Sequence, residues 1–312
     1  MPAAHPTDLP ATLLPSSFSS PTTDAEARAM IAALDASLDH HRATVEGRDV
    51  VFRRTGTGPP LLLVHGGHGC WLHWAKNIAA LARRRSVWLV DMPGYGDSGT
   101  LADPPTLEHL AGALADAVAQ VLGADTPLDV AGFSFGGLVA AHMSALRLQH
   151  TAGSVRRVAL LGTSGHGSMR RERLRMLDWK DVADDPAERD RRLAHNLMAL
   201  MLHDPAALDP LALALHRQAC LQTRFVSKAY ASCAVIGPAL DALAADGVPV
   251  LLAWGFHDVT ATPAETAPAV AAGRNGCTWR LLPDAGHWMQ YERPGATDAL
   301  LLEWLQAGEA KL

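Results

Sequence analysis

Residues 130–137 read VAGFSFGG and place Ser134 between two glycines. The preceding residues 128–131 are typical of a short buried strand, whereas residues 137–148 are rich in Ala, Leu and Met and predict a helix. A Gly-x-Ser-x-Gly motif at a strand-to-helix junction makes a sharp turn that exposes the serine hydroxyl. Alone, the stretch also fits a glycine-rich turn with a capping serine, which is the less favoured alternative. Motifs elsewhere in the chain distinguish a sharp turn that exposes the serine from a simple capped turn.

A sharp turn at this place explains the residues that flank the serine. Gly132 and Gly136 are needed because side chains there would collide with the neighbouring backbone. The N–H of Phe135 would lie at the N-terminus of the helix, where it can donate to an oxyanion formed at a substrate carbonyl. The motif therefore predicts a nucleophilic serine with one oxyanion donor beside it.

A second oxyanion donor is expected from the loop at residues 65–69 (HGGHG), which follows a strand predicted at residues 61–64. Glycines at the end of a buried strand let the backbone approach a ligand closely. We place the donor at Gly67, with His68 as the alternative. For His65 we expect a structural role, in which its ring bonds nearby backbone and fixes the loop.

Four potential zinc ligands fall in one short segment near this loop: His65, His68, Cys70 and His73. Their spacing matches neither a zinc finger nor a metalloprotease motif. We therefore expect no metal and no cofactor.

The composition indicates a folded α/β domain of ordinary surface charge. The chain has 312 residues, of which 48% are hydrophobic and 19% charged, enough for one large domain or a domain with an insert. The net charge of −5 favours neither nucleic acid nor an anionic membrane as partner. The arginines at 83–85 are interpreted as a solvated helix end.

Cysteine usage and the N-terminal sequence bear on location. The four cysteines are scattered and predict free thiols in a reducing compartment: Cys70, Cys220, Cys233 and Cys277. No apolar run is long enough to span a bilayer. Residues 1–21 lack the basic and apolar regions of a signal peptide, and we expect them to form a loosely packed arm.

Strand and helix patterns alternate through most of the chain. A helix is predicted at 23–41 on the domain surface, and others at 71–81, 107–121, 137–148 and 294–305. Strands are predicted at 43–46, 49–54, 61–64, 87–90, 128–131, 155–161, 248–254 and 277–282. Such alternation predicts a parallel sheet covered by helices on both faces.

The alternation is interrupted between residues 163 and 246, where strand signals are rare. Helices are predicted there at 170–179, 187–202, 210–223 and 225–233. An insertion after the carboxyl end of a strand lies where a site opens, so we interpret it as a helical cap over Ser134. The Met and Leu residues at 197–202 are assigned to the core rather than to a substrate wall. The domains are then 1–42 (arm and helix), 43–162 with 247–312 (core), and 163–246 (cap).

Two late strands are followed by residues that can activate a serine. Asp258 lies in the turn after the strand at 248–254, and His287 follows the strand at 277–282. A serine hydroxyl needs an adjacent base; a histidine can accept its proton while an aspartate fixes the imidazole tautomer. Asp284 is the rival acid, but it precedes His287 too closely to reach the far ring nitrogen easily.

Ser134, Asp258 and His287 follow the chain order nucleophile, acid, histidine of the α/β-hydrolase fold, which this chain resembles. Three segments resemble other landmarks of that superfamily: residues 65–67 (HGG), 91–98 (DMPGYGDS) and 286–288 (GHW). The resemblance implies a mostly parallel sheet of about eight strands, flanked by helices and with a helical cap inserted after the sixth strand.

Within the superfamily, the cap and residues 286–292 resemble the branch that contains carboxylesterases and meta-cleavage-product hydrolases, which cut carbon–carbon bonds. In that branch a cap arginine binds a substrate carboxylate, and Arg217 falls near its place. The turn around Ser134 differs from that of the carbon–carbon hydrolases. They carry Asn or Ser before the serine and Met after it, where this chain has Phe133 and Phe135. Ser134 also departs from dehalogenases and soluble epoxide hydrolases, which use an aspartate there.

We therefore predict a cytoplasmic, cofactor-free serine hydrolase that cleaves a small or medium carboxylic ester. Substrate contacts are assigned to His68, Phe133, Arg217 and Trp288. For Arg217 the alternative is a solvated position on the outer face of its helix. The alternatives are a carbon–carbon hydrolase acting on a diketone acid, and a ligand receptor that keeps the triad but turns over little. The expected partner is a small acyl substrate, without nucleic acid or membrane, and the chain could form a homodimer.

Overall fold

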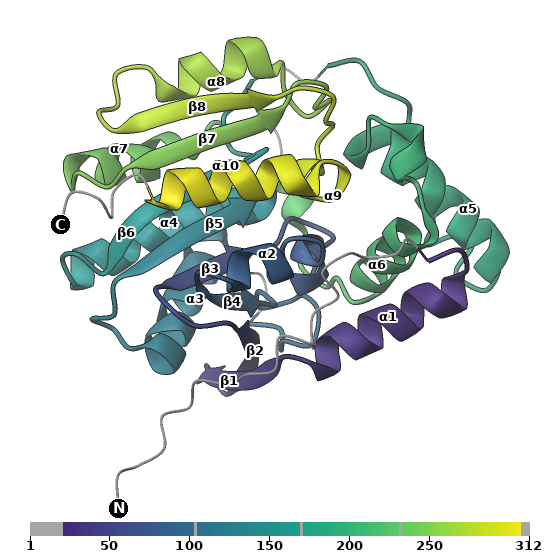
Figure 1. Cartoon of the computed structure of the whole chain (residues 1–312), viewed down its shortest axis with the longest axis horizontal. Helices are drawn as coiled ribbons and strands as arrows, with labels where there is room; N and C mark the ends of the chain where they lie inside the picture. Colours follow the sequence, from purple (N-terminus) through teal and green to yellow (C-terminus); the bar gives the residue numbers. More distant parts are fainter. Residues whose placement is uncertain (1–20, 103–104, 169–170, 231–232, 307–312) are drawn as a thin grey trace, which may run out of the picture.

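The computed structural model describes residues 21–102, 105–168, 171–230 and 233–306. Its centre is one eight-stranded sheet with the order β1-β2-β4-β3-β5-β6-β7-β8 (Figure 1). The strands are β1 Asp39–Val45, β2 Arg48–Thr55, β3 Pro60–Val64, β4 Ser86–Val90, β5 Leu128–Phe133, β6 Val155–Leu161, β7 Val250–Gly255 and β8 Cys277–Leu282. The β1–β2 and β2–β4 pairs are antiparallel and the other five pairs are parallel, so the expected mostly parallel sheet is confirmed.

Alternating residues of the central strands feed two hydrophobic layers. In β3, Leu62 and Val64 face one layer and Leu61 and Leu63 the other, and all four are fully buried. A strand buried on both faces reads as a continuous apolar run, which is why the run at 61–64 predicted it correctly.

Helices cover both faces of the sheet. The helices are α1 Asp24–Ala36, α2 Ile78–Ala82, α3 Leu107–Leu122, α4 Phe135–His150, α5 Pro186–Asn196, α6 Pro210–Leu221, α7 Gly237–Ala245, α8 Pro263–Ala271, α9 Met289–Glu292 and α10 Pro294–Gln306. α3, α4, α7 and α8 contribute to one hydrophobic layer, and α2 and α10 contribute to the other.

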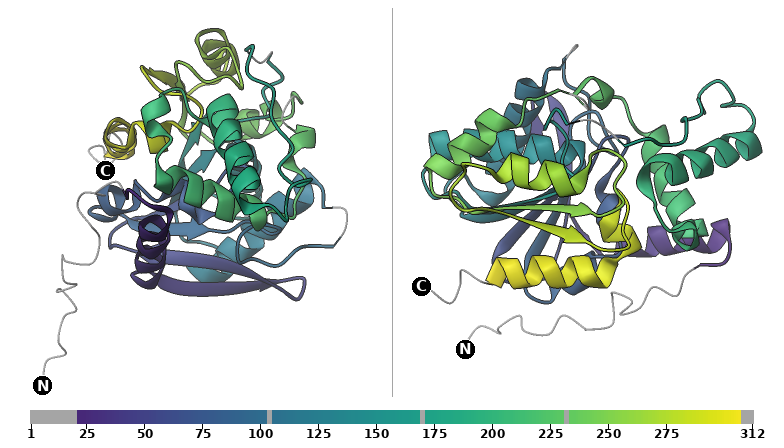
Figure 2. Two further views of the ribbon diagram at one scale, coloured as in Figure 1. Left: turned by 90° about the vertical axis from the view of Figure 1, so that its right-hand side faces the viewer. Right: turned by 90° about the horizontal axis from the view of Figure 1, so that it is seen from above.

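Between β6 and β7 the chain leaves the sheet. α5 packs against α6, and α6 packs against α1, so that these three helices gather at one end of the sheet (Figures 1 and 2). α7 instead packs against α4 and β7. The helical insertion was predicted, but the cap boundary drawn at residue 246 encloses a helix that lies on the sheet.

Helix α1 joins the insertion to the sheet. It begins with a capping box, in which Thr23 and Glu26 satisfy each other's backbone N–H groups. Asp24 at its first turn pairs with Arg217 of α6, and Asp35 at its last turn pairs with Arg53 of β2 at 2.5 Å.

Several predicted helices are shorter than expected. The first ends at Ala36 rather than residue 41, because β1 begins at Asp39. The helix predicted at 71–81 is a 3₁₀ turn, Trp71–Trp74, followed by α2. The arm predicted at 1–21 lies outside the described residues except for its last position.

Two helices predicted in the insertion are wrong. Residues 171–179 have no regular structure, because their backbone bonds distant groups: Leu177 exchanges two 2.8 Å hydrogen bonds with the Asn196 side chain. In the segment predicted at 225–233, only the 3₁₀ turn Ser227–Tyr230 forms, and residues 231–232 lie outside the described chain.

A buried carboxyl on α10 predicts how stability depends on pH. Burial raises the pKa of Asp298 to about 7, and its hydrogen bond from Asn77 Nδ2, 2.8 Å long, only partly opposes this. The folded state therefore binds this proton more tightly than the unfolded state, and its contribution to stability is lost as pH rises towards 7. We expect Asp298→Asn to raise Tm relative to wild type increasingly between pH 5 and pH 8. Asp116→Asn, on the exposed side of α3, should parallel wild type; parallel curves for Asp298→Asn would contradict the prediction.

Candidate active site

The turn around Ser134 has the geometry that its glycines predicted. β5 ends at Phe133 and α4 begins at Phe135, and Ser134 between them has a φ of 54°. A Cβ on Gly132 would lie 2.6 Å from the carbonyl oxygen of Gly136, and a Cβ on Gly136 would lie 1.9 Å from that of His65. Both positions exclude side chains, so the sharp turn rather than a simple capped helix is present.

The turn after β7 and the loop after β8 are held together by their backbones. His257 N–H donates to the carbonyl oxygen of Ala285 at 2.9 Å, and Phe256 N–H donates to that of Leu282 at 2.8 Å. A Cβ on Gly255 would lie only 2.1 Å from the carbonyl oxygen of Gly286. This close contact brings Asp258 and His287 together from two different strands.

His287 lies between Ser134 and Asp258. The Ser134 hydroxyl donates to His287 Nε2 at 2.9 Å, and His287 Nδ1–H donates to Asp258 Oδ2 at 2.7 Å. Asp258 is fully buried and His287 is 3% exposed, so their bond is shielded from water, whereas Ser134 is half-buried. Asp284, the rival acid, has an exposed side chain.

Thr260 holds the other oxygen of Asp258, a role that sequence reasoning missed. Its backbone N–H and its hydroxyl both donate to Oδ1 at 2.7 Å. Burial opposes ionisation of Asp258, but the contacts with His287 and Thr260 outweigh burial and lower the pKa of this carboxyl. The carboxylate is therefore charged and fixed in orientation at neutral pH.

The loop at 65–69 runs beside Ser134. A Cβ on Gly66 would lie 3.1 Å from Ser134 Cβ, and one on Gly67 would lie 3.5 Å from Phe135 Cβ. Within the described part of the chain, the N–H groups of Gly67 and Phe135 donate no hydrogen bond, so they are free for a ligand. His68 has a φ of 49°, and burial lowers its pKa.

Two of the four potential zinc ligands, His65 and His73, instead bond to backbone groups. His65 Nδ1–H donates to the carbonyl oxygen of Gly66 at 2.8 Å, and its Nε2 accepts the N–H of Met92 at 3.0 Å, which confirms the structural role. His73 Nδ1 accepts the N–H of Gly66 at 3.1 Å. Burial lowers the pKa of His65 to about 4, so its ring is neutral at physiological pH.

Phe133 and Trp288, assigned to the substrate, are fully buried beside the triad. The ring centroids of Phe133 and His287 are 4.9 Å apart, and Trp288 Nε1–H donates to the carbonyl oxygen of His73 at 3.0 Å. The Phe133 ring therefore packs against His287, whereas the Trp288 ring packs against His73 and Tyr291. Whether either one touches substrate stays a prediction.

Arg217 lies in a different place from the one expected. Its guanidinium pairs with Asp190 of α5 at 2.5 Å and with Asp24 of α1, and its side chain is 11% exposed. The helix pattern alone could not show this, because both carboxylates come from other helices. The geometry therefore gives Arg217 a role in joining helices.

Phe225 of the insertion packs beside Phe135, and sequence reasoning did not identify this contact. The Phe225 ring lies 5.5 Å from that of Phe135 and 5.9 Å from that of Tyr95, between centroids. Beside it, a Cβ on Gly67 would lie 2.4 Å from Ser227 Oγ. No local signal marks these residues, because they approach the site only through the tertiary fold.

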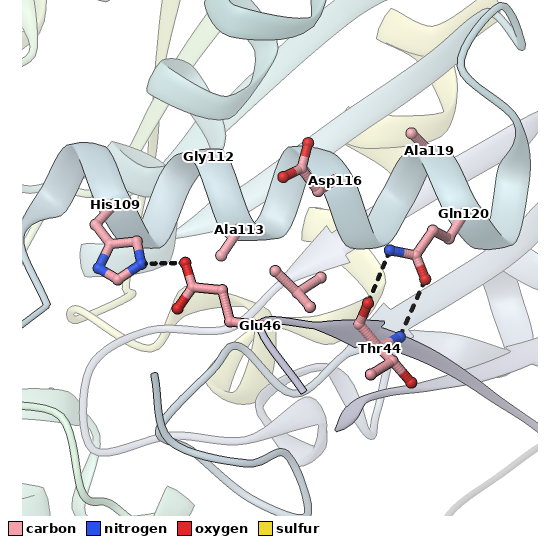
Figure 3. A pocket seen from close by; sticks show the side chains of 9 residues that line it. Thr44, Glu46, His109, Gly112, Ala113, Asp116, Ala119 and Gln120 are labelled. Atoms are coloured by element: carbon pink, nitrogen blue, oxygen red, sulfur yellow. Dashed lines mark hydrogen bonds and ion pairs between the residues drawn. The ribbon is translucent and has the colours of Figure 1, made fainter. Parts of the chain in front are cut away.

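Two cavities lie away from the triad. One, of about 560 Å³, opens between β1 and α3, where His109 pairs with Glu46 at 2.6 Å and Gln120 bonds the backbone of Thr44 (Figure 3). The other, of about 500 Å³, borders Phe225 and Arg224. Neither is lined by a member of the triad.

All four cysteines are free thiols, as expected. Among the described residues, no helix combines the length and the apolar character needed to cross a bilayer.

Comparisons with known proteins agree with this geometry. The sequence model of the family described as alpha/beta hydrolase fold matches residues 59–294. The dihydrolipoyllysine-residue acetyltransferase component of the acetoin cleaving system from Cupriavidus necator is 27% identical, over 87% of this chain and 70% of its own length. The pimeloyl-[acyl-carrier protein] methyl ester esterase of Chromobacterium violaceum is 40% identical over 35% of this chain and 39% of its own length. The crystal structure of the enol-lactonase from Burkholderia xenovorans LB400 superposes with a TM-score of 0.66 at 25% identity, covering 85% of this chain and all of that one.

Proposed function

Because the chain belongs to the α/β-hydrolase fold family, we propose that it is a serine hydrolase that cleaves a small or medium carboxylic ester. The observation that carries this proposal is the chain of hydrogen bonds from Ser134 through His287 to Asp258. The names of relatives with an esterase or lactonase activity support the same bond type.

In the first half of the reaction, Ser134 Oγ attacks the ester carbonyl carbon while His287 Nε2 accepts its proton. The charged Asp258 keeps the proton of the neutral ring on Nδ1 and stabilises the imidazolium that forms. The N–H groups of Gly67 and Phe135 would donate to the developing oxyanion. His287 then gives the proton to the leaving alcohol, and an acyl group remains on Ser134.

In the second half, water replaces the alcohol. His287 Nε2 accepts a proton from the water as its oxygen attacks the acyl carbon, and the same donors bind the second oxyanion. Collapse of this intermediate returns the proton to Ser134 Oγ and releases the carboxylic acid. The cycle uses only side chains and backbone groups of this chain.

The contacts of Arg217 favour a neutral substrate over a diketone acid. A carbon–carbon hydrolase of the resembled branch would need a free guanidinium for its substrate carboxylate, whereas that of Arg217 is held by Asp24 and Asp190. We therefore retain the ester as substrate class. We give the part of the insertion that precedes α7 the role of a cap. The free thiols support a cytoplasmic location.

The test is steady-state turnover of p-nitrophenyl acetate and butyrate beside a carboxylate-bearing ring-fission diketone. We expect measurable kcat for the neutral esters and none for the diketone. Turnover of the diketone alone would favour the carbon–carbon hydrolase. Binding of esters without turnover would favour the receptor.

Arg217→Ala separates a structural from a substrate role. We expect kcat/KM for neutral esters to change by less than about tenfold, or roughly 1.4 kcal/mol, because no catalytic group is removed. Stability should fall by roughly 1–2 kcal/mol, since two partly exposed carboxylates lose their partner. Arg191→Ala, which removes an exposed pair with Glu188, is the control for charge loss. A large loss confined to an acidic substrate that wild type turns over would overturn the assignment.

A further inference from the structure

A buried carboxylate links the insertion to the loop that carries His287. Glu292 ends α9 and is 7% exposed. Its Oε1 accepts the N–H groups of His203 at 2.7 Å and Asp204 at 2.9 Å, and its Oε2 accepts the N–H of Gly286 at 2.6 Å. One side chain therefore satisfies three backbone donors from two segments that are far apart in the sequence.

On the side of the catalytic loop, both neighbours of His287 are bonded. Gly286 N–H is held by Glu292, and Trp288 N–H donates to the carbonyl oxygen of Met201 at 2.7 Å. A Cβ on Gly286 would lie 2.7 Å from His203 N, so the two backbones touch directly. The position of the imidazole is thus determined partly by residues of the insertion.

On the side of the insertion, the donors follow a π-helical turn, Leu197–Met201. Leu202 N–H donates to the carbonyl oxygen of Leu197 at 2.9 Å, which closes this wide turn and ends the helix. The next N–H groups, of His203 and Asp204, are then available to an outside acceptor, and Glu292 supplies it. Single π turns recur where a helix serves a functional site.

We propose that Glu292 is a positioning residue that makes the orientation of His287 depend on docking of residues 201–204 against the catalytic loop. The inference rests on the proposed function, in which His287 is the base. A buried carboxylate that accepts three N–H groups fixes backbone more firmly than a neutral group, because each bond is charge-assisted. Losing it would let residues 285–288 shift, and a shift of about 1 Å at a reacting group costs about 10²-fold in rate.

Glu292→Gln tests the coupling while keeping the shape of the side chain. An amide has one oxygen for two positions, so its NH₂ group must face an N–H donor at one of them. We expect kcat for a p-nitrophenyl ester to fall about 10- to 100-fold with KM within about threefold of wild type. The second-order rate at which a fluorophosphonate labels Ser134 should fall by the same factor, because labelling needs the Ser134–His287 pair but no particular substrate. Glu292→Asp, which keeps the charge on a shorter stem, should retain more activity.

Arg293→Ala is the matched control. Arg293 pairs with Asp204 at 3.3 Å, so it joins the same two segments through partly exposed side chains and leaves the three N–H bonds intact. We expect its kcat and labelling rate to stay within about twofold of wild type. Equal losses in Arg293→Ala and Glu292→Gln would overturn the inference, because general attachment of the insertion would then explain both.

A fold check and a spectroscopic signature complete the design. Assays run at least 10 °C below the Tm of each variant separate misplacement from unfolding, and Glu292→Asp carries the test if Glu292→Gln does not fold. The downfield imidazole N–H resonance of the His287–Asp258 bond should shift or broaden in Glu292→Gln and stay unchanged in Arg293→Ala. Wild-type labelling and resonance in folded Glu292→Gln would overturn the inference. Wild-type protein that does not label at Ser134 would instead overturn the proposed function.

Discussion

Ser134→Ala should lower kcat for ester hydrolysis by about 10⁶-fold. Alanine lacks the oxygen that forms the acyl-enzyme, and His287 then has no hydroxyl to deprotonate. The fold should persist, because within the described residues the serine hydroxyl bonds only His287, and the backbone φ of 54° is as accessible to alanine as to serine.

Turnover of p-nitrophenyl butyrate and a thermal unfolding curve measure the two effects. Ser144→Ala is a suitable control, because this serine lies on the same helix, α4, is fully buried and finds no hydrogen-bond partner among the described residues. Ser144→Ala should keep wild-type activity. A kcat close to that of wild type in folded Ser134→Ala would mean that another group is the nucleophile.

Asp258→Asn should cost about 10³- to 10⁴-fold in kcat, and the contacts of Thr260 explain the direction. Thr260 N–H can only donate, so the single amide oxygen of asparagine stays at Oδ1. The NH₂ group then faces His287 Nδ1, which must become an acceptor. The ring proton moves to Nε2, and the ring can no longer accept the proton of Ser134.

Asp284→Asn is the matched control for this replacement, since Asp284 is the exposed carboxylate nearest to His287 in the sequence. Its kcat should stay within about threefold of wild type. Comparison of kcat for both variants at one saturating ester concentration is sufficient. A reversed order of the two losses would assign the third member of the triad to Asp284.

Much of the fold could be predicted because its signals are local. Buried parallel strands read as apolar runs, as at residues 61–64, and glycines mark the turn at Ser134 where no side chain fits. Asp258 and His287 could be predicted for a similar reason. Each follows a strand of the same parallel sheet, so their carboxyl-end turns meet at one edge.

The remainder depends on contacts between distant segments. Residues 171–179 were predicted to be helical from composition, but Asn196 supplies their hydrogen bonds instead. The pattern of α6 could not show that Arg217 faces Asp24 of α1. Thr260 and Glu292 belong to no sequence motif. Thr260 donates to Asp258, and Glu292 accepts N–H groups of residues distant in the sequence, so only the folded chain shows these contacts.

Helix α1 has a practical consequence for anyone who shortens this chain. A helix of this length spans about 20 Å, and its two ends bond the insertion through Asp24 and the sheet through Asp35. Removing it would uncover the apolar residues of α6 against which it packs and leave Arg217 with one carboxylate. A tag placed before residue 21 keeps helix α1 and both of these ion pairs. A fusion that starts at β1 would keep the strands of the sheet but remove the contacts of α1 with the insertion, which would then be held by its remaining contacts, such as those of Glu292.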